Sequence, residues 1–145
     1  MSGHDVVTEA RRWLGTGYVH QASRLGAGTD CLGLLRGVWR ALLGSEPEVV
    51  PPYTQDWSEP GGQEDLLAAA TQWLIARLDG SDAVGDVLIF RMRLGHMAKH
   101  VGIAATLGPR PTFIHAYTGH GVVETALSEP WARRVVARFE FPKGA

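Results

Sequence analysis

Helical patterns occupy the first half of this chain and short β-type runs occupy the second, an order that constrains the fold more than any other feature. Apolar residues recur at helical spacing in residues 6–14, 34–43 and 63–78. Short runs rich in β-branched and aromatic residues follow at 87–91, 99–106, 112–116, 121–125 and 135–141. Helices followed by strands predict an α+β domain with an antiparallel sheet, because βαβ winding would alternate the two.

Length and charge narrow the class of protein. The 145 residues predict a single domain covering residues 1–145. A net charge of -1 lacks the basic excess that a nucleic-acid-binding protein needs. No run approaches the roughly 18 apolar residues of a membrane span, and the first residues lack the apolar core of a signal peptide. We therefore expect no nucleic-acid partner, no membrane insertion, and synthesis in the cytoplasm without a signal peptide.

Cap and turn residues set the expected helix boundaries. Asp5 is the predicted N-cap of the first helix, and Thr29 or Asp30 caps the second. Residues 15–29 contain four glycines and no sustained periodicity, which indicates a loop able to carry functional groups. Residues 45–62 contain four prolines and predict an irregular surface segment.

The single cysteine, Cys31, falls in the first turn of the second predicted helix. The N–H groups and the positive dipole at a helix start favour a thiolate. Such sites lower the pKa of a cysteine from about 8.5 to roughly 3.5–7.5 when a histidine also helps. A reactive thiol is therefore one interpretation. A small apolar side chain packed on the helix is the other, because buried free cysteines are common.

Two histidines lie on neighbouring predicted strands. Strand alternation places His100 on a face that otherwise carries only Gly102 and Ala104, which leaves room for the helix end bearing Cys31. If the next strand is an antiparallel neighbour, His115 can bond the second ring nitrogen of His100. The three side chains would then supply a nucleophile, a base and an orienting group. A lone histidine in a strand is also commonly structural.

A zinc site is the competing arrangement. His96 and His100 are four residues apart and could share a helix face, with His115 or Cys31 as a third ligand. Met97 follows His96, so the glutamate of an HExxH motif is absent, and the β-type run after His100 argues against a helix there. We expect neither a metal nor another cofactor.

Four segments stand in a fixed order along the chain: GTGYVHQASRLGAGTDCLGLLRGVWR, GDVLIFR, KHVGI and FIHAYTGHGVVET. Together they resemble the NlpC/P60 cell-wall peptidases, particularly the short form found with phage tails and gene transfer agents, over residues 6–141. The resemblance implies a papain-like α+β fold in which Cys31 attacks an amide of the peptidoglycan stem peptide, commonly the γ-D-glutamyl–diaminopimelate bond. It assigns His100 as the base and His115 as the group that orients it.

The resemblance assigns two more residues beside the nucleophile. Tyr18 matches the tyrosine whose hydroxyl, with the backbone N–H of Cys31, would stabilise the oxyanion. Asp30 matches the acidic residue that helps to hold the free amino end of the substrate, a role that can coexist with helix capping. The chain departs from the family pattern at three positions: Gly17 replaces the usual proline, His20 a tryptophan and Leu32 a serine. Leucine at position 32 removes a serine hydroxyl from the side of the site that would bind the amino end of the substrate.

The implied function is a metal-independent cysteine endopeptidase mounted on a phage-like tail to open the cell wall. Its partners would be peptidoglycan stem peptides and tail-tip or baseplate proteins, and its site of action the cell wall or periplasm. A structural tail-tip component with the same fold and little activity is the alternative. A cytoplasmic acyl or amide hydrolase on this fold is a third possibility.

Overall fold

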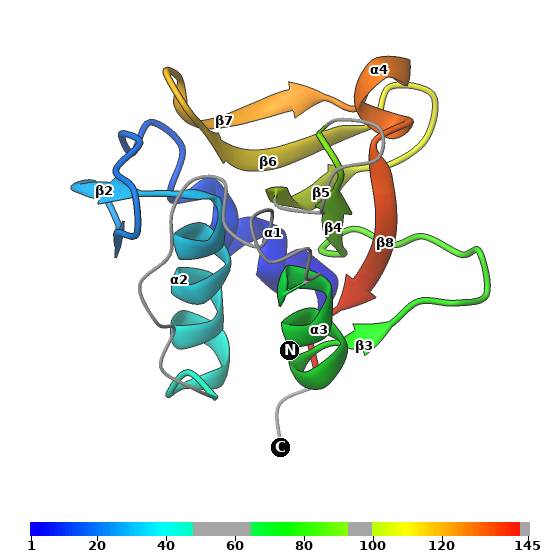
Figure 1. Cartoon of the computed structure of the whole chain (residues 1–145), viewed down its shortest axis with the longest axis horizontal. Coiled ribbons are helices and arrows are strands. Elements are labelled where there is room, and N and C mark those ends of the chain that lie inside the picture. The colour runs from blue at the N-terminus through cyan, green and yellow to red at the C-terminus, as the bar shows by residue number, and fades with distance from the viewer. Residues whose placement is uncertain (48–64, 93–99, 143–145) are drawn as a thin grey trace.

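An antiparallel sheet of six strands forms the centre of the computed structural model, which describes residues 1–47, 65–92 and 100–142 (Figure 1). Every neighbouring pair of strands runs antiparallel. The predicted α+β class is therefore confirmed. In sheet order the strands are β3 (Ile75–Ala76), β8 (Val135–Glu140), β4 (Val87–Phe90), β5 (His100–Thr106), β6 (Thr112–Tyr117) and β7 (Gly121–Ala126).

The five strands from β4 to β8 match the five predicted β-type runs, with ends that differ by one residue at most. The short strand β3 has no counterpart in the prediction. It falls inside the predicted helix at 63–78, because the chain leaves the helix after residue 73 and pairs with β8 instead. Pairing with a strand some sixty residues later is a tertiary effect that local periodicity does not contain.

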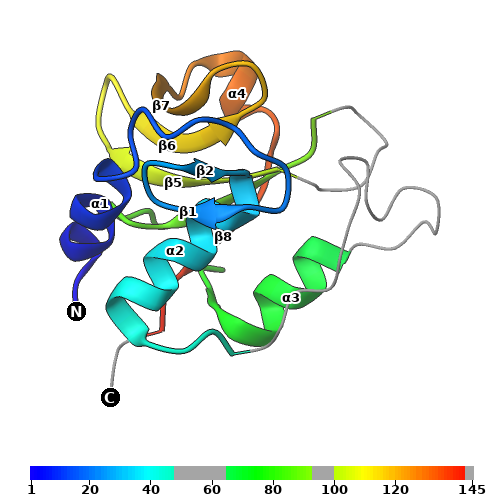
Figure 2. The same cartoon turned by 90° about the vertical axis from the view of Figure 1, so that its left-hand side faces the viewer.

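Three helices lie on one side of the sheet: α1 (Gly3–Arg11), α2 (Cys31–Leu43) and α3 (Asp65–Trp73) (Figure 2). The prediction that Asp5 caps α1 is wrong. Ser2 is the N-cap: its Oγ accepts the N–H of Asp5 at 3.3 Å, and the carboxylate of Asp5 accepts the N–H of Ser2 at 2.8 Å. This reciprocal pair is a capping box, and it starts the helix three residues earlier than predicted. No described helix combines the length and apolarity needed to cross a bilayer.

The predicted loop at 15–29 contains a small hairpin of β1 (Ser23–Arg24) and β2 (Gly28–Thr29), which is separate from the main sheet. A short helix, α4 (Glu129–Ala132), follows β7 and has no counterpart in the prediction. Of the predicted irregular segment at 45–62, residues 48–62 lie outside the described part of the chain.

Apolar side chains pack on both faces of the sheet, and the two faces meet different elements. One face, which includes Val87, Ile89, Val101 and Ile103, packs against α1, α2 and α3. The opposite face packs against the single helix α4 and its tryptophan, and it is formed by Leu88, Phe90, Ala104 and Phe113. The sheet therefore separates a large core under the helices from a smaller aromatic cluster.

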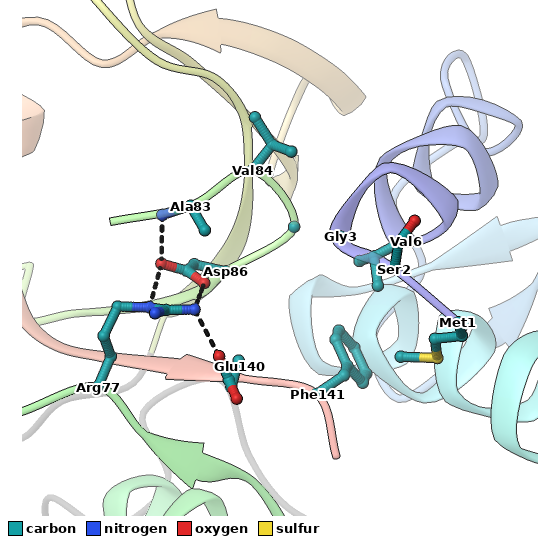
Figure 3. Close-up of a pocket in the computed structure, with 11 residues that line it drawn as sticks. Met1, Ser2, Gly3, Val6, Arg77, Ala83, Val84, Asp86, Glu140 and Phe141 are labelled. Carbon is teal, nitrogen blue, oxygen red and sulfur yellow. Dashed lines mark hydrogen bonds and ion pairs between the residues drawn. The ribbon is translucent and has the colours of Figure 1, made fainter. Parts of the chain in front are cut away.

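A cluster of charged residues ties the strands together at the end of the sheet where β4 begins (Figure 3). Asp86 is 1% exposed, and its carboxylate accepts bonds from both Nε and a terminal nitrogen of Arg77, each at 2.9 Å. It also accepts from Arg138 Nε at 3.1 Å, while Arg77 pairs with Glu140 at 2.6 Å. These bonds join β8 to the two ends of the segment between β3 and β4. The other end of β4 pairs with His100, so this cluster lies apart from the predicted site.

Candidate active site

Helix α2 begins at Cys31 because Asp30 caps it. One carboxylate oxygen of Asp30 accepts the N–H of Gly33 at 2.7 Å, and the other accepts the N–H of Gln21, also at 2.7 Å. Asp30 therefore closes the helix start and holds the preceding loop with the same side chain. The predicted position of Cys31 in the first turn is confirmed.

The hairpin before α2 is fixed on the first turns of the helix. Ser23 Oγ donates to the carbonyl of Gly33 at 2.6 Å, and Arg40 donates to the carbonyl and the hydroxyl of Ser23. A Cβ atom on Gly33 would overlap the carbonyl of Ala22 and approach Thr29 Oγ1 to 2.5 Å. Only glycine lets the loop lie this close to the first turn of the helix.

The two histidines are joined by a short hydrogen bond. His100 on β5 and His115 on β6 face each other with Nε2 of the first 2.7 Å from Nδ1 of the second. The contact that strand alternation predicts is therefore present. The second nitrogen of His115, Nε2, lies 3.0 Å from Thr125 Oγ1 on β7. Three neighbouring strands thus contribute one side chain each to a continuous chain of hydrogen bonds.

The prediction that the Cys31 end of the helix lies beside Gly102 and Ala104 is wrong. Helix α2 packs on the opposite face of β5. The space above Gly102 is filled from the neighbouring strand: a Cβ there would approach the Phe113 ring to 2.8 Å and His115 Cβ to 3.3 Å. The thiol of Cys31 lies instead against the backbone of Val101, the residue after His100.

No hydrogen bond joins the Cys31 thiol to His100 within the residues that the structure describes. The contact of the thiol with the backbone of Val101 nevertheless places sulfur at the start of β5, next to the histidine-bearing residue. Hydrogen bonds between a nucleophile and its base are often long in an empty site and tighten when substrate binds. The arrangement therefore holds a thiol and an imidazole at one end of β5.

An aromatic cluster encloses the histidine pair. Trp131 of α4 lies with its ring centroid 5.9 Å from that of His100 and 5.1 Å from that of His115. The rings of Phe90, Phe113 and Tyr117 lie 5.2–5.6 Å from Trp131. His100 is left 7% exposed and His115 1% exposed. Both imidazoles are therefore largely removed from water.

Burial shifts the pKa of each member of the site toward its neutral form. It lowers the pKa of His100 to about 3, with a smaller contribution from His115. It lowers the pKa of His115 to about 4, with a smaller contribution from His120. It raises the pKa of the Cys31 thiol to about 12, assisted by the charge of Asp30. All three side chains are therefore uncharged at neutral pH.

The lowered cysteine pKa expected from the helix start is therefore not found. The residue retains some exposed surface, but its thiol is enclosed, and loss of hydration outweighs the favourable backbone groups at the helix start. The adjacent carboxylate of Asp30 also opposes a second negative charge. Sequence position alone does not reveal this enclosure, since it is created by strands that follow some seventy residues later.

The remaining predicted site residues flank the thiol. Burial raises the pKa of Tyr18, whose hydroxyl bonds the Thr118 side chain and lies within electrostatic range of Cys31. Asp30 is 2% exposed, and His20 Nδ1 lies 3.9 Å from its carboxylate. Tyr18 is thus near the sulfur, as oxyanion stabilisation requires. The role of Asp30 in holding a substrate amine stays a prediction.

Sequence reasoning assigned no role to Thr125 or Trp131, which complete the histidine environment. A weak signal for α4 was present: Ser128 precedes Glu129 and Pro130, an order typical of a helix start. Of the competing zinc ligands, His96 lies outside the described residues. Within the described ranges, no group of three His, Cys, Asp or Glu side chains is arranged to hold a metal.

Comparison with known proteins identifies the fold. No protein-family model and no curated protein matches the sequence. Among solved structures, the NlpC/p60 domain of the peptidoglycan hydrolase SagA superposes with a TM-score of 0.64 at 22% identity, covering 97% of this chain and 100% of that one. An NlpC/P60 family protein from Bacillus cereus superposes with a TM-score of 0.66 at 16% identity. The match covers 97% of this chain and 40% of that protein's chain.

A lipoprotein-like protein of the NLP/P60 family from Staphylococcus aureus gives a TM-score of 0.61 at 19% identity, covering 98% of this chain and 42% of its own. At such identities the likeness concerns the fold. The chain has the NlpC/P60 fold, and the predicted papain-like architecture is confirmed.

Proposed function

We propose that the chain is a peptidoglycan hydrolase of the NlpC/P60 family, a cysteine peptidase with Cys31 as its nucleophile. One observation supports this most directly. Its single thiol stands at the start of a helix beside a strand whose histidine is bonded to a second histidine. The name of SagA, a peptidoglycan hydrolase of the same fold, supports the substrate class.

Because the Cys31 thiol and the His100 imidazole are both neutral, the first step must move a proton between them. Sγ of Cys31 attacks the carbonyl carbon of the scissile amide while its proton passes to Nδ1 of His100, so a thiolate need not exist beforehand. The oxyanion accepts bonds from the Cys31 N–H and the Tyr18 hydroxyl. His115 Nδ1 holds the His100 ring by its hydrogen bond with His100 Nε2 during the transfer.

Collapse of the tetrahedral adduct breaks the carbon–nitrogen bond, and His100 returns the proton to the leaving amine. A thioester then joins Cys31 to the acyl part of the substrate. Water attacks the thioester with His100 as base, which releases the carboxylate product and restores the thiol. No step requires a metal.

The peptidoglycan bond that is cleaved and the biological setting of the cleavage belong to the same proposal. The sequence motifs resemble family members that cut the γ-D-glutamyl–diaminopimelate bond, and particularly the short form carried by phage-like tails. We therefore place the chain at the cell wall, held by tail-tip or baseplate proteins. A structural tail component with the same fold and little activity is the alternative, and a wild-type chain that stays in the tail without cleaving sacculi would favour it.

Mass spectrometry of digested peptidoglycan tests the activity. The wild type should release fragments with a new amino end on diaminopimelate, and saturating EDTA should leave the rate unchanged. Cys31→Ala should release none, while its free energy of unfolding stays within about 1–2 kcal/mol of wild type. Full activity of Cys31→Ala, or inhibition by EDTA that zinc reverses, would refute the thiol mechanism. Proteomics of purified particles tests the tail location.

A further inference from the structure

A histidine that orients another histidine has two possible proton arrangements, and only one of them leaves a base for the thiol. A carboxylate in this place would always accept a hydrogen bond, but a neutral imidazole can donate or accept at either nitrogen. Nε2 of His100 is occupied by the bond to His115. Nδ1 of His100 is therefore the ring nitrogen left to take a proton from Cys31.

This requirement fixes the direction of both hydrogen bonds. A neutral His100 with a free Nδ1 carries its proton on Nε2 and donates it to Nδ1 of His115. A neutral His115 that accepts at Nδ1 must carry its own proton on Nε2. That nitrogen points to Thr125 Oγ1 at 3.0 Å, and the hydroxyl oxygen accepts the bond.

The reverse arrangement would disable the site. If His115 carried its proton on Nδ1, it would donate to His100 Nε2 and force the proton of His100 onto Nδ1. His100 could then accept nothing from the thiol. Protonation of His100 would also place two N–H groups face to face across 2.7 Å.

The surroundings of His115 leave Thr125 as the hydrogen-bond partner of its Nε2. Tyr117 stacks on the ring at 29° and Trp131 meets it at 80°, so both neighbours contact the imidazole through their rings. His115 is 1% exposed, and water is not a ready substitute partner. A buried N–H without an acceptor is costly, which disfavours the productive arrangement if the hydroxyl is lost.

We propose that Thr125 is a positioning residue that accepts the Nε2–H of His115 and thereby keeps Nδ1 of His100 free to act as the base. Its effect on activity rests on the proposed thiol mechanism, whereas the proton positions can be measured without any substrate. Thr125 acts on the reaction only through the two histidines.

Nitrogen NMR of protein labelled with ¹⁵N-histidine tests the proton positions, because protonated and unprotonated ring nitrogens have well-separated shifts. At pH 7 the wild type should carry its protons on Nε2 in both His100 and His115. Thr125→Ser should give the same pattern. Thr125→Val, which keeps the shape and removes the hydroxyl, should shift His115 toward the Nδ1–H form. A wild-type His115 with its proton on Nδ1 would overturn the proposal, and so would an unchanged pattern in Thr125→Val.

Kinetics supplies the second readout. Thr125→Val should lower kcat about tenfold, the scale of one buried donor left without its partner, with little change in KM. Thr125→Ser should restore most of the rate.

Thr71→Val is the matched control, because the Thr71 hydroxyl donates to a backbone carbonyl within α3, away from the histidines. The Thr71→Val protein should have the kcat of the wild type. Equal kcat for wild type and Thr125→Val would contradict the proposal. A wild type that cleaves no peptidoglycan peptide would refute the proposed function, while the NMR result would still decide the proton arrangement.

Discussion

At the scale of single residues, Asp30 joins helix α2, which begins at Cys31, to the loop before it. Its two carboxylate oxygens accept one backbone N–H each, from Gly33 and Gln21. Gln21 has φ of 66°, a left-handed conformation that side chains other than glycine adopt at a cost. The hydrogen bond that the Gln21 N–H donates to Asp30 helps to hold this strained residue next to the start of α2.

We expect Asp30→Asn to destabilise the protein by about 1–3 kcal/mol, because an amide has a single acceptor oxygen and one of the two N–H groups loses its partner. A simple cap exchange would cost only a few tenths of a kcal/mol. Urea unfolding measures the difference. Asp5→Asn in the capping box of α1 is the matched control and should cost less. Equal losses for the two variants would show that Asp30 acts as an ordinary cap.

The same variant tests whether Asp30 also holds a substrate amine. A carboxylate binds an ammonium group through a charge-assisted bond that a neutral amide does not equal. Asp30→Asn should therefore lower kcat/KM more for stem peptides with a free amino end than for the same peptides acetylated. A common loss for both peptides would leave Asp30 with its structural role alone.

Residue types and spacing were enough to predict the position of Cys31 and the contact between His100 and His115, and they limited the helix cap to Thr29 or Asp30. The protonation states were not predictable. They depend on how completely Trp131 and the neighbouring strands remove water, and that depends on the final packing of distant segments. The cysteine pKa consequently moves opposite to the direction expected from the helix start.

At the scale of elements, the first turn of α2 and the β1–β2 hairpin approach each other at a glycine. Gly33→Ala should destabilise the protein by about 1–3 kcal/mol, because the added methyl group overlaps the carbonyl of Ala22. Thermal unfolding provides the measurement. Gly17→Ala is a useful comparison, since a Cβ atom there meets nothing within 4 Å. A Gly33→Ala protein as stable as Gly17→Ala would mean that the loop moves away freely.

Helix α4 has only four residues, yet its tryptophan covers both histidines. Replacing Trp131 with leucine should admit water and raise the pKa of His100 and His115 toward the ordinary value, because burial is the main cause of the lowering. Proton NMR titration of the ring C–H signals follows both groups. Trp131→Phe should show a smaller rise. Unchanged titration curves in Trp131→Leu would show that other residues exclude the water.

The pattern of predicted and missed elements has a common physical basis. Strands β4 to β8 carry runs of β-branched and aromatic residues that are visible locally. In contrast, α4 is too short to show a period, and β3 depends on pairing with β8. Elements with a sequence pattern long enough to show a period were predicted, and short elements such as α4, β1, β2 and β3 were not.

At the scale of the whole molecule, the histidine pair makes stability depend on pH. Folding lowers the pKa of His100 to about 3 and that of His115 to about 4, whereas an unfolded histidine titrates near 6.5. Below that value the unfolded chain binds more protons than the folded one. The free energy of unfolding should therefore be highest above pH 6.5 and fall on acidification, by up to about 1.4 kcal/mol per pH unit for each histidine.

Urea unfolding between pH 7 and pH 5 tests this dependence above the range in which most carboxylates titrate. His115→Gln keeps a hydrogen-bonding side chain but removes one of the two titrating groups, so its stability should fall less steeply with acid. Parallel curves for wild type and His115→Gln would mean that His115 takes up its proton equally well when folded.

The position of β8 in the sheet has a consequence for biosynthesis. Although β8 is the last strand along the chain, it lies between β3 and β4 in the interior of the sheet. A nascent polypeptide that has emerged only as far as β7 already holds the thiol and both histidines, but it lacks the strand that joins β3 to the rest and the helix that covers the imidazoles. The histidine pair therefore lacks its tryptophan cover, and β3 its pairing partner, until the segment from α4 to β8 has left the ribosome.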